Sequence, residues 1–222
     1  MMIPMTRALM ATVLLFGATL AQPLFSQDVN PGPPSSAPAP AQAWEFSAAA
    51  YTYFVPDETN YVSPYVKADR KWLHLEARYN YEGQETASAW VGFNFRTGNN
   101  FVFEITPMVG AVFGKTQGVA PGALMSMAYR KFDLSTESEY VFDTEDQTGN
   151  FFYTWSELGY SPADWLRMGV AGQRTRAYET PLELQRGPFV GVSYKNLNVT
   201  TYVFNLGWTD PTIVLAATWV FP

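Results

Sequence analysis

The chain has no cysteine, one histidine and few charged residues, and these shortages exclude several classes of protein. Without cysteine there is no disulfide scaffold, no thiolate metal site and no cysteine nucleophile. A single histidine, His74, cannot build a histidine-based metal cluster. The formal net charge of −6 argues against nucleic acid as a partner, which requires a basic surface. We therefore expect no metal, no cofactor and no nucleic-acid partner.

The chain also lacks a convincing amphipathic helix from Trp44 onward. Short runs of alternating apolar and polar residues occur instead, separated by turn residues at regular spacing, which is typical of an all-β barrel or sandwich. Pro107 cannot donate to a sheet ladder, so it should mark a bulge or a locally broken pairing. The spacing predicts about twelve antiparallel strands, near 44–55, 61–69, 71–82, 86–96, 101–113, 119–130, 132–142, 150–160, 165–177, 183–194, 198–206 and 212–221.

The first forty residues differ from the rest of the chain. Arg7 precedes an apolar run, residues 8–20, that is too short to cross a membrane as a helix. This pattern predicts a secretory signal peptide over residues 1–21, with an uncleaved helical anchor as the alternative. Residues 22–43 form a Pro/Ala-rich stretch without apolar periodicity, which predicts an extended linker. The folded body is then expected over residues 44–222.

The expected third strand shows two faces of different character. Because successive side chains in a strand point to opposite sides, its odd and even positions separate. One face carries Leu73, Leu75, Ala77, Tyr79 and Tyr81. The other carries Trp72, His74, Glu76, Arg78, Asn80 and Glu82.

Alternation alone does not say which face is inward, and other features choose between the possibilities. The polar face includes Trp72, Trp90, Tyr153 and Trp155, which is unusual for a face in free contact with water. The apolar face continues over many strands, and no helix is predicted to cover it, so it needs lipid. We therefore predict apolar residues outside and charges inside, as in a membrane barrel. A soluble secreted barrel that binds an apolar ligand is the alternative.

The turns fall into two groups. Counting along the chain, the odd turns, such as residues 56–60 and 143–149, are mostly acidic. The even turns, such as residues 69–71 and 195–197, are tighter and richer in bases. This segregation predicts that all odd turns lie at one end of the barrel, with short turns at both ends.

The last strand ends where the sequence ends. Ile213, Leu215, Ala217, Trp219 and Phe221 share one face of it. This pattern resembles the C-terminal assembly signal of bacterial outer-membrane β-barrels, although Pro222 follows the terminal aromatic. The resemblance implies a transmembrane antiparallel up-and-down β-barrel in the outer membrane of a Gram-negative bacterium. It also implies periplasmic termini with a periplasmic linker over residues 22–43, contact with outer-membrane lipid, and recognition by the barrel-assembly machinery. The last core strand of a secreted sandwich is the alternative.

The inward face then predicts the functional residues. The expected pore lining is Lys67, His74, Glu76, Arg78, Asn94, Arg96, Glu104, Glu137, Glu139, Glu157, Arg167 and Gln173. Small twelve-stranded channels for acidic sugars or nucleosides have a similar size, which favours a narrow porin-like channel for small hydrophilic solutes. Eight strands leave room only for side chains and sixteen leave a channel, so a salt-bridged, filled interior with a structural or adhesion role is the alternative. A lipid hydrolase that uses His74 is a third hypothesis, but we expect no enzyme.

Overall fold

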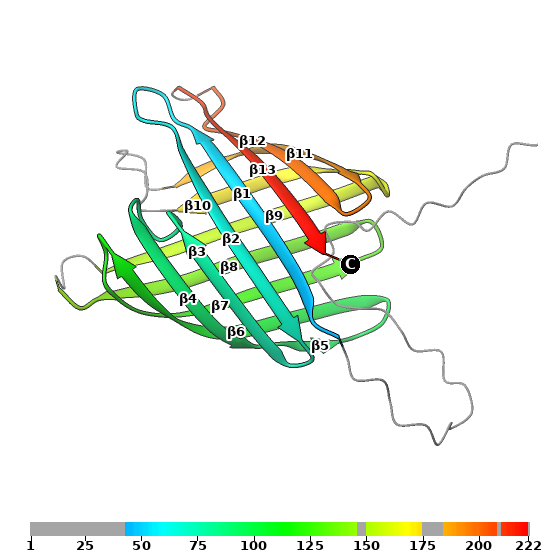
Figure 1. The fold of residues 1–222 in the computed structure, drawn as a ribbon. Helices are drawn as coiled ribbons and strands as arrows, with labels where there is room; N and C mark the ends of the chain where they lie inside the picture. Colours follow the sequence, from blue (N-terminus) through cyan, green and yellow to red (C-terminus); the bar gives the residue numbers. More distant parts are fainter. Residues whose placement is uncertain (1–42, 146–149, 175–183, 208–209, 222) are drawn as a thin grey trace, which may run out of the picture.

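A computed structural model describes residues 43–145, 150–174, 184–207 and 210–221. The predicted signal peptide and all but the last residue of the predicted linker lie outside these residues. The described residues form one antiparallel sheet that curves until it closes on itself (Figure 1). None of them belongs to a helix long and apolar enough to cross a membrane.

The sheet closes where the beginning of the body meets its end. The first strand pairs with the last in unbroken antiparallel register, from Phe46 facing Phe221 to Phe54 facing Ile213. The other strands pair with their neighbours in sequence, except that β4 and β5 do not pair with each other. The strands are β1 (Glu45–Phe54), β2 (Tyr61–Arg70), β3 (Leu73–Tyr79), β4 (Thr86–Phe93), β5 (Phe95–Thr97), β6 (Phe101–Gly114), β7 (Gly118–Tyr129), β8 (Phe132–Asp143), β9 (Phe151–Ala163), β10 (Leu166–Arg174), β11 (Gln185–Tyr194), β12 (Leu197–Phe204) and β13 (Thr212–Phe221).

Two of these segments, β4 and β5, form one strand of the wall, because both pair with β6. Gly92 faces Met108 and Phe95 faces Ile105, so the register passes the gap with no inserted residue. The gap lies opposite Pro107, which has no N–H to donate. Of the two effects predicted for Pro107, the broken pairing is confirmed and the bulge is not found. The described strands therefore make a closed barrel of twelve, as predicted.

The two ends of the barrel differ in the length of their connections. At the end where β1 begins and β13 finishes, here called the terminal end, two or three residues join successive strands. At the opposite loop end the connections are mostly longer, including residues 55–60, 80–85 and 205–211. The tight turns begin with a residue in the left-handed region, at Lys71, Arg130 and Lys195, which reverses the chain sharply. The predicted segregation of turns is thus confirmed.

The predicted assignment of faces is confirmed along the strands. In β3, Glu76 and Arg78 are 5% and 3% exposed, whereas Leu75 on the opposite face is 37% exposed. In β4 and β5, Phe93 and Phe95 are half exposed on the outer wall. A soluble barrel would show the reverse arrangement, so that alternative does not fit the structure.

Two aromatic residues of the third strand depart from the predicted faces. Trp72 was expected inside, but it is exposed and stacks on Phe93 of the outer wall, with ring centroids 4.8 Å apart. Tyr81 was expected outside, but its hydroxyl accepts a hydrogen bond from the Tyr153 hydroxyl in the interior, at 2.9 Å. Both residues follow a left-handed residue, Lys71 or Asn80, where strand alternation no longer holds.

The outer wall has an aromatic girdle near each end. Exposed aromatic residues near the terminal end are Trp44, Phe46, Trp72, Phe93, Phe95, Phe101, Tyr129, Phe132, Tyr160, Trp165, Tyr194, Trp219 and Phe221. Those near the loop end are Phe54, Tyr79, Phe113, Tyr140, Phe142 and Phe152. An outward apolar band between two aromatic girdles is the surface of a transmembrane barrel. The residues that resemble an assembly signal all lie on this outer wall: Ile213, Leu215, Ala217, Trp219 and Phe221.

Candidate functional site: the barrel interior

The predicted lining residues all lie on the inner wall. Lys67 and His74 are on β2 and β3, Asn94 and Arg96 lie along β4 and β5, and Glu104 is on β6. The remaining residues are Glu76, Arg78, Glu137, Glu139, Glu157, Arg167 and Gln173, on β3, β8, β9 and β10. Their inward position follows from strand parity. Their role as the lining of a water-filled pore stays a prediction.

Arg78 is the centre of the largest ionic cluster. Its Nε donates to Glu76 Oε1 at 3.0 Å, and its Nη1 donates to Glu139 Oε2 at 2.9 Å. Nη1 also lies 2.6 Å from Glu137 Oε1 and 3.5 Å from Glu82 Oε1. Because β4, β6 and β7 separate β3 from β8 around the wall, the contacts to Glu137 and Glu139 cross the interior of the barrel.

Aromatic rings cover the faces of the same guanidinium. The guanidinium carbon of Arg78 lies 4.5 Å from the centre of the Tyr81 ring and 4.6 Å from that of Trp90. The indole Nε1 of Trp90 donates to Ser88 Oγ at 2.9 Å. Ser88 Oγ donates in turn to Glu82 Oε1 at 2.6 Å. The cation is therefore held from its edges by carboxylates and from its faces by rings.

A chain of polar contacts extends from this cluster toward the terminal end. His74 contacts Glu76 through Nε2 at 3.2 Å and Asp69 through Nδ1 at 2.8 Å. Asn94 Nδ2 donates to Asp69 Oδ1 at 2.7 Å, and Thr106 Oγ1 donates to Asn94 Oδ1 at 2.7 Å. Because Glu76 also contacts Arg78, these contacts link β6, β2 and β3 to β8. The polar groups on this side of the interior are thus bonded mainly to one another.

A second ionic cluster lies on the opposite side of the interior. The guanidinium of Arg167 on β10 donates to Asp133 and to Glu157, which are on β8 and β9. The hydroxyl of Tyr202 donates to Glu157 Oε1 at 2.7 Å, and Trp155 Nε1 donates to the same oxygen at 2.8 Å. Glu157 therefore joins the ionic cluster to the neighbouring aromatic residues.

A third ion pair lies near the terminal end. Arg96 Nη1 is 2.9 Å from Glu104 Oε1, and Ser126 Oγ donates to Glu104 Oε2 at 3.1 Å. The Arg96 side chain is 34% exposed, so this pair is more open to solvent than the Arg78 cluster.

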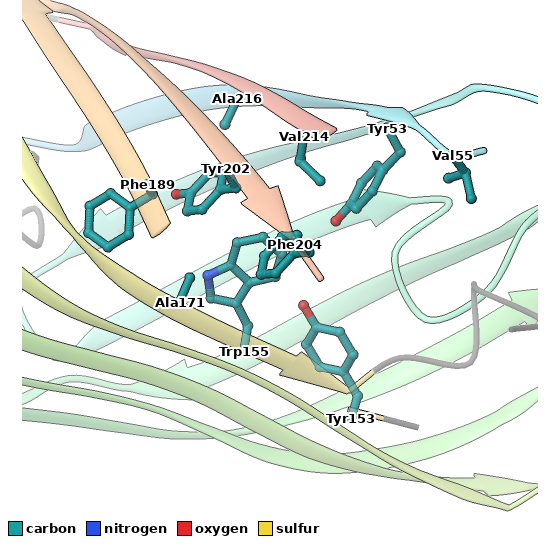
Figure 2. Packing of buried hydrophobic residues seen from close by; sticks show 10 residues of the cluster. All are labelled: Tyr53, Val55, Tyr153, Trp155, Ala171, Phe189, Tyr202, Phe204, Val214 and Ala216. Atoms are coloured by element: carbon teal, nitrogen blue, oxygen red, sulfur yellow. The ribbon is translucent and has the colours of Figure 1, made fainter. Parts of the chain in front are cut away.

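The loop-end half of the interior is filled by apolar and aromatic side chains. Figure 2 shows Tyr53, Val214 and Phe204 from one wall pointing toward Trp155 and Tyr153 from the other. Across the interior, the Tyr51 and Trp155 ring centroids lie 5.7 Å apart, in edge-to-face contact. A second buried cluster joins Trp90, Met108, Val112, Ala120 and Val141. Side chains from different strands thus pack against one another in the loop-end half of the barrel.

The ionic groups of the interior carry an excess of negative charge. Among the described residues, ion pairs of the interior involve four bases, Lys67, Arg78, Arg96 and Arg167, and eight carboxylates, Asp69, Glu76, Glu82, Glu104, Asp133, Glu137, Glu139 and Glu157. With His74 neutral, their formal charge is −4. Burial raises the pKa of Glu82, in the turn after β3, although Arg78 and hydrogen bonds from Ser88 and Trp90 oppose the rise.

Three acids of these clusters, Asp69, Glu82 and Asp133, are absent from the predicted pore lining, although Glu82 was placed on the inward face of the third strand. Asp69 and Asp133 lie at the ends of predicted strands, next to the turns, and in the structure both point inward from β2 and β8. Strand parity gave the signal, because Asp69 lies two residues from Lys67 and Asp133 four residues from Glu137, which puts each acid on the same face as a predicted lining residue.

The interior has neither the geometry of a serine hydrolase nor that of a metal site within the described ranges. Both ring nitrogens of His74 contact carboxylates, Asp69 and Glu76, so neither is placed to take a proton from a serine. In the described part of the chain, no group of three or more histidines and acids is arranged to hold a metal ion.

No family model matches the chain, and no curated protein matches it. Among solved structures, the chain is similar to the outer membrane protein Omp33 of Acinetobacter baumannii. The two sequences are 9% identical, the match covers 82% of this chain and 100% of that one, and the TM-score is 0.43. The assignment as a transmembrane barrel therefore rests on the closed sheet and its outer wall.

Proposed function

We propose that this protein is a bacterial outer-membrane barrel with a filled interior, which serves as a structural wall element and does not pass solutes in this state. The contacts that cross the interior carry the proposal. Arg78 meets Glu137 and Glu139 across the barrel, and Tyr153 meets Tyr81. A path for hydrophilic solutes would have to break these contacts. Of the two functions predicted from the lining, the geometry thus favours the structural one.

Planar-bilayer recording tests this proposal. The purified full-length protein is expected to give no steady unitary currents above those of a protein-free bilayer. Arg78→Ala is the informative variant, because it removes the side chain that joins opposite walls, and it should raise the frequency of openings. Steady currents from the unmodified protein would overturn the proposal in favour of a channel.

A narrow channel with a preference for cations is the second candidate. The excess of carboxylates over bases in the interior favours it, because a ring of like charge selects the opposite ion. Under a potassium chloride gradient, any current should reverse at a potential that indicates cation preference. Glu104→Gln, near the more open terminal end, should weaken that preference. A reversal potential that indicates anion preference would exclude this candidate.

For the orientation, we propose that the terminal end faces the periplasm. Bacterial outer-membrane barrels have short periplasmic turns and longer extracellular loops, and the connections of this barrel differ in the same sense. An epitope inserted at the 55–60 connection should bind antibody on intact cells. An epitope inserted in the turn between β7 and β8, at Arg130, should bind antibody only after the outer membrane is permeabilised. The opposite labelling pattern would reverse the orientation.

A further inference from the structure

A groove on the outer wall has a lining that a uniformly lipid-facing surface does not need. It runs along β9, β10 and β11 toward the loop end and has a volume of about 520 Å³. Its lining residues are Ser156, Leu158, Val170, Ala171, Gly172, Arg186, Gly187, Pro188 and Leu206. The volume falls within the range of small-molecule sites. The groove combines apolar side chains with one hydroxyl and one guanidinium.

The charges of the outer wall have one sign. In the described strands, the charged side chains at outward positions are Arg70, Arg174 and Arg186, and none is an acid. Arg70 lies at the terminal end, over the ring of Trp44. Arg174 and Arg186 lie together at the loop end, since Arg186 faces Gly172 and Arg174 follows two residues later on the same face. An arginine pair at the level of lipid headgroups attracts anions.

Hydroxyl groups continue from the groove into the middle of the wall. Ser156 Oγ pairs with Thr136 Oγ1 at 2.7 Å, and Thr154 Oγ1 pairs with Ser138 Oγ at 3.0 Å. All four residues lie on the outer face, between the two aromatic girdles. When Thr136 donates to Ser156, the hydroxyl hydrogen of Ser156 is available to a carbonyl group in the groove. Hydroxyls at this depth are unusual on a wall that faces only hydrocarbon.

We propose that this groove binds one phosphate-bearing membrane lipid. An acyl chain lies along Leu158, Val170 and Pro188, and the phosphate is bound by Arg186 with Arg174 beside it. A guanidinium carries five N–H donors in a planar fork, and it binds a phosphate through two parallel hydrogen bonds. Ser156 donates to the ester carbonyl at the head of the chain. The position of the arginines and the absence of acids among the described outward strand positions favour a lipid over a protein partner.

The floor of the groove provides a selective way to fill it. A Cβ added at Gly172 would have one neighbour within 4 Å, the backbone oxygen of Gln185 at 3.8 Å. A larger side chain there projects outward into the groove without displacing the sheet. Gly172→Leu should therefore fill the site in a folded barrel, and Gly172→Ala is the matched control that leaves most of the space open.

Native mass spectrometry of the full-length protein, released from micelles that contain one added lipid, tests the proposal. The probes are phosphatidic acid and phosphatidylcholine with identical acyl chains. The unmodified protein should retain one phosphatidic acid in preference to phosphatidylcholine. The double variant Arg174→Gln/Arg186→Gln should retain it roughly tenfold less, the loss expected for a charge-assisted contact. Gly172→Leu should lose retention of both lipids, whereas Gly172→Ala and Arg70→Gln should keep it.

Three outcomes would overturn the proposal. The first is equal retention of the two lipids by the unmodified protein. The second is unchanged retention in Gly172→Leu or in the double arginine variant, with circular dichroism confirming that each barrel is folded. The third is a dimer that Gly172→Leu converts to a monomer without a change in retained lipid, which would make the groove a contact between two copies of the chain.

Discussion

The inner and outer walls of this barrel are made of alternate residues of the same strands, yet polar groups on the two walls find their hydrogen-bond and ion-pair partners in different ways. On β3, His74, Glu76 and Arg78 point inward, while Leu75 and Ala77 point outward. Inside, Arg78 meets carboxylates from its own strand and, across the barrel, from β8. Outside, the hydroxyl pairs between β8 and β9 are satisfied by their immediate neighbours. Partners on distant strands permit buried charge inside the barrel, whereas a polar side chain on the outer wall can reach only its neighbours on the same face.

The width of the barrel makes the inner arrangement possible. An eight-stranded barrel leaves room only for its own side chains, and a sixteen-stranded barrel keeps opposite walls out of reach. With twelve strands, an arginine on β3 and glutamates on β8 can meet across the space. Two kinds of substitution test this comparison of the two walls. One removes a partner of an interior polar group, and the other adds a charge to the outer wall.

Arg78→Met should have the largest effect on stability. It leaves Glu76, Glu82, Glu137 and Glu139 buried without their shared cation, and breaking such a cluster costs about 3–5 kcal/mol. The measurement is the midpoint of urea unfolding for the barrel folded in lipid vesicles. Lys67→Met is the control, because Lys67 has one carboxylate partner in this cluster, Glu76 at 3.5 Å, and should cost less. Equal midpoints for the two variants would contradict a central role for Arg78.

Ala77→Arg should have the next largest effect, because it places a charge between the girdles of the outer wall. Arginine at the middle of a lipid-facing strand costs roughly 2–4 kcal/mol, falling to about 0–1 kcal/mol near the interfaces. Tyr79→Arg, two residues further along β3 in the loop-end girdle, is therefore the matched control. The same urea midpoints measure both. If Ala77→Arg proved harmless, the outer wall would not face lipid at that height.

Tyr153→Phe should have a smaller effect. It removes the hydroxyl that donates to Tyr81 across the interior and keeps the ring in the aromatic cluster. The net loss for one hydrogen bond is about 0.5–1.5 kcal/mol. Unfolding midpoints should shift accordingly, with Tyr140→Phe on the outer wall as the control that leaves the midpoint unchanged. A loss as large as that of Arg78→Met would mean that the aromatic contact, rather than the ionic one, joins the walls.

The double variant Thr136→Val/Ser156→Ala should have the smallest effect on stability. Replacing both members of a hydrogen-bonded pair by apolar groups of similar shape is nearly neutral. Thr136→Val alone leaves the Ser156 hydroxyl without its partner in an apolar setting and should cost about 1 kcal/mol. The difference between the single and double variants, from urea unfolding in vesicles, measures how far the outer wall depends on local pairing. Additive losses would contradict it.

Strand positions and faces could be predicted from the sequence because the side-chain period is two. His74, Glu76 and Arg78 alternate with Leu75 and Ala77, and one choice of face fixes all of them. The same rule failed where the backbone leaves the extended region. Lys71 and Asn80 adopt left-handed angles, and the aromatic residue after each lies on the opposite wall from the one predicted.

The pairing of charges across the interior could not be predicted in the same way. Alternation says that Arg78 and Glu139 both point inward, but their meeting depends on the tilt and stagger of the closed barrel. Those quantities are set by the register of all strands together, from Phe46 facing Phe221 onward. The packing in the loop-end half likewise depends on which aromatic side chains lie at the same height along the barrel axis. The sequence of one strand does not give that height.

The Arg78 cluster joins strands that are not neighbours in the wall, and this affects how fast the barrel unfolds. Its carboxylates come from β8 as well as from β3 and the following turn, so the cluster is complete only after the sheet has curved round. Interactions that form after the rate-limiting step of folding leave the folding rate unchanged and slow unfolding. We therefore expect the cluster to form late in folding and to slow unfolding, which would lengthen the lifetime of the assembled barrel beyond what its equilibrium stability implies.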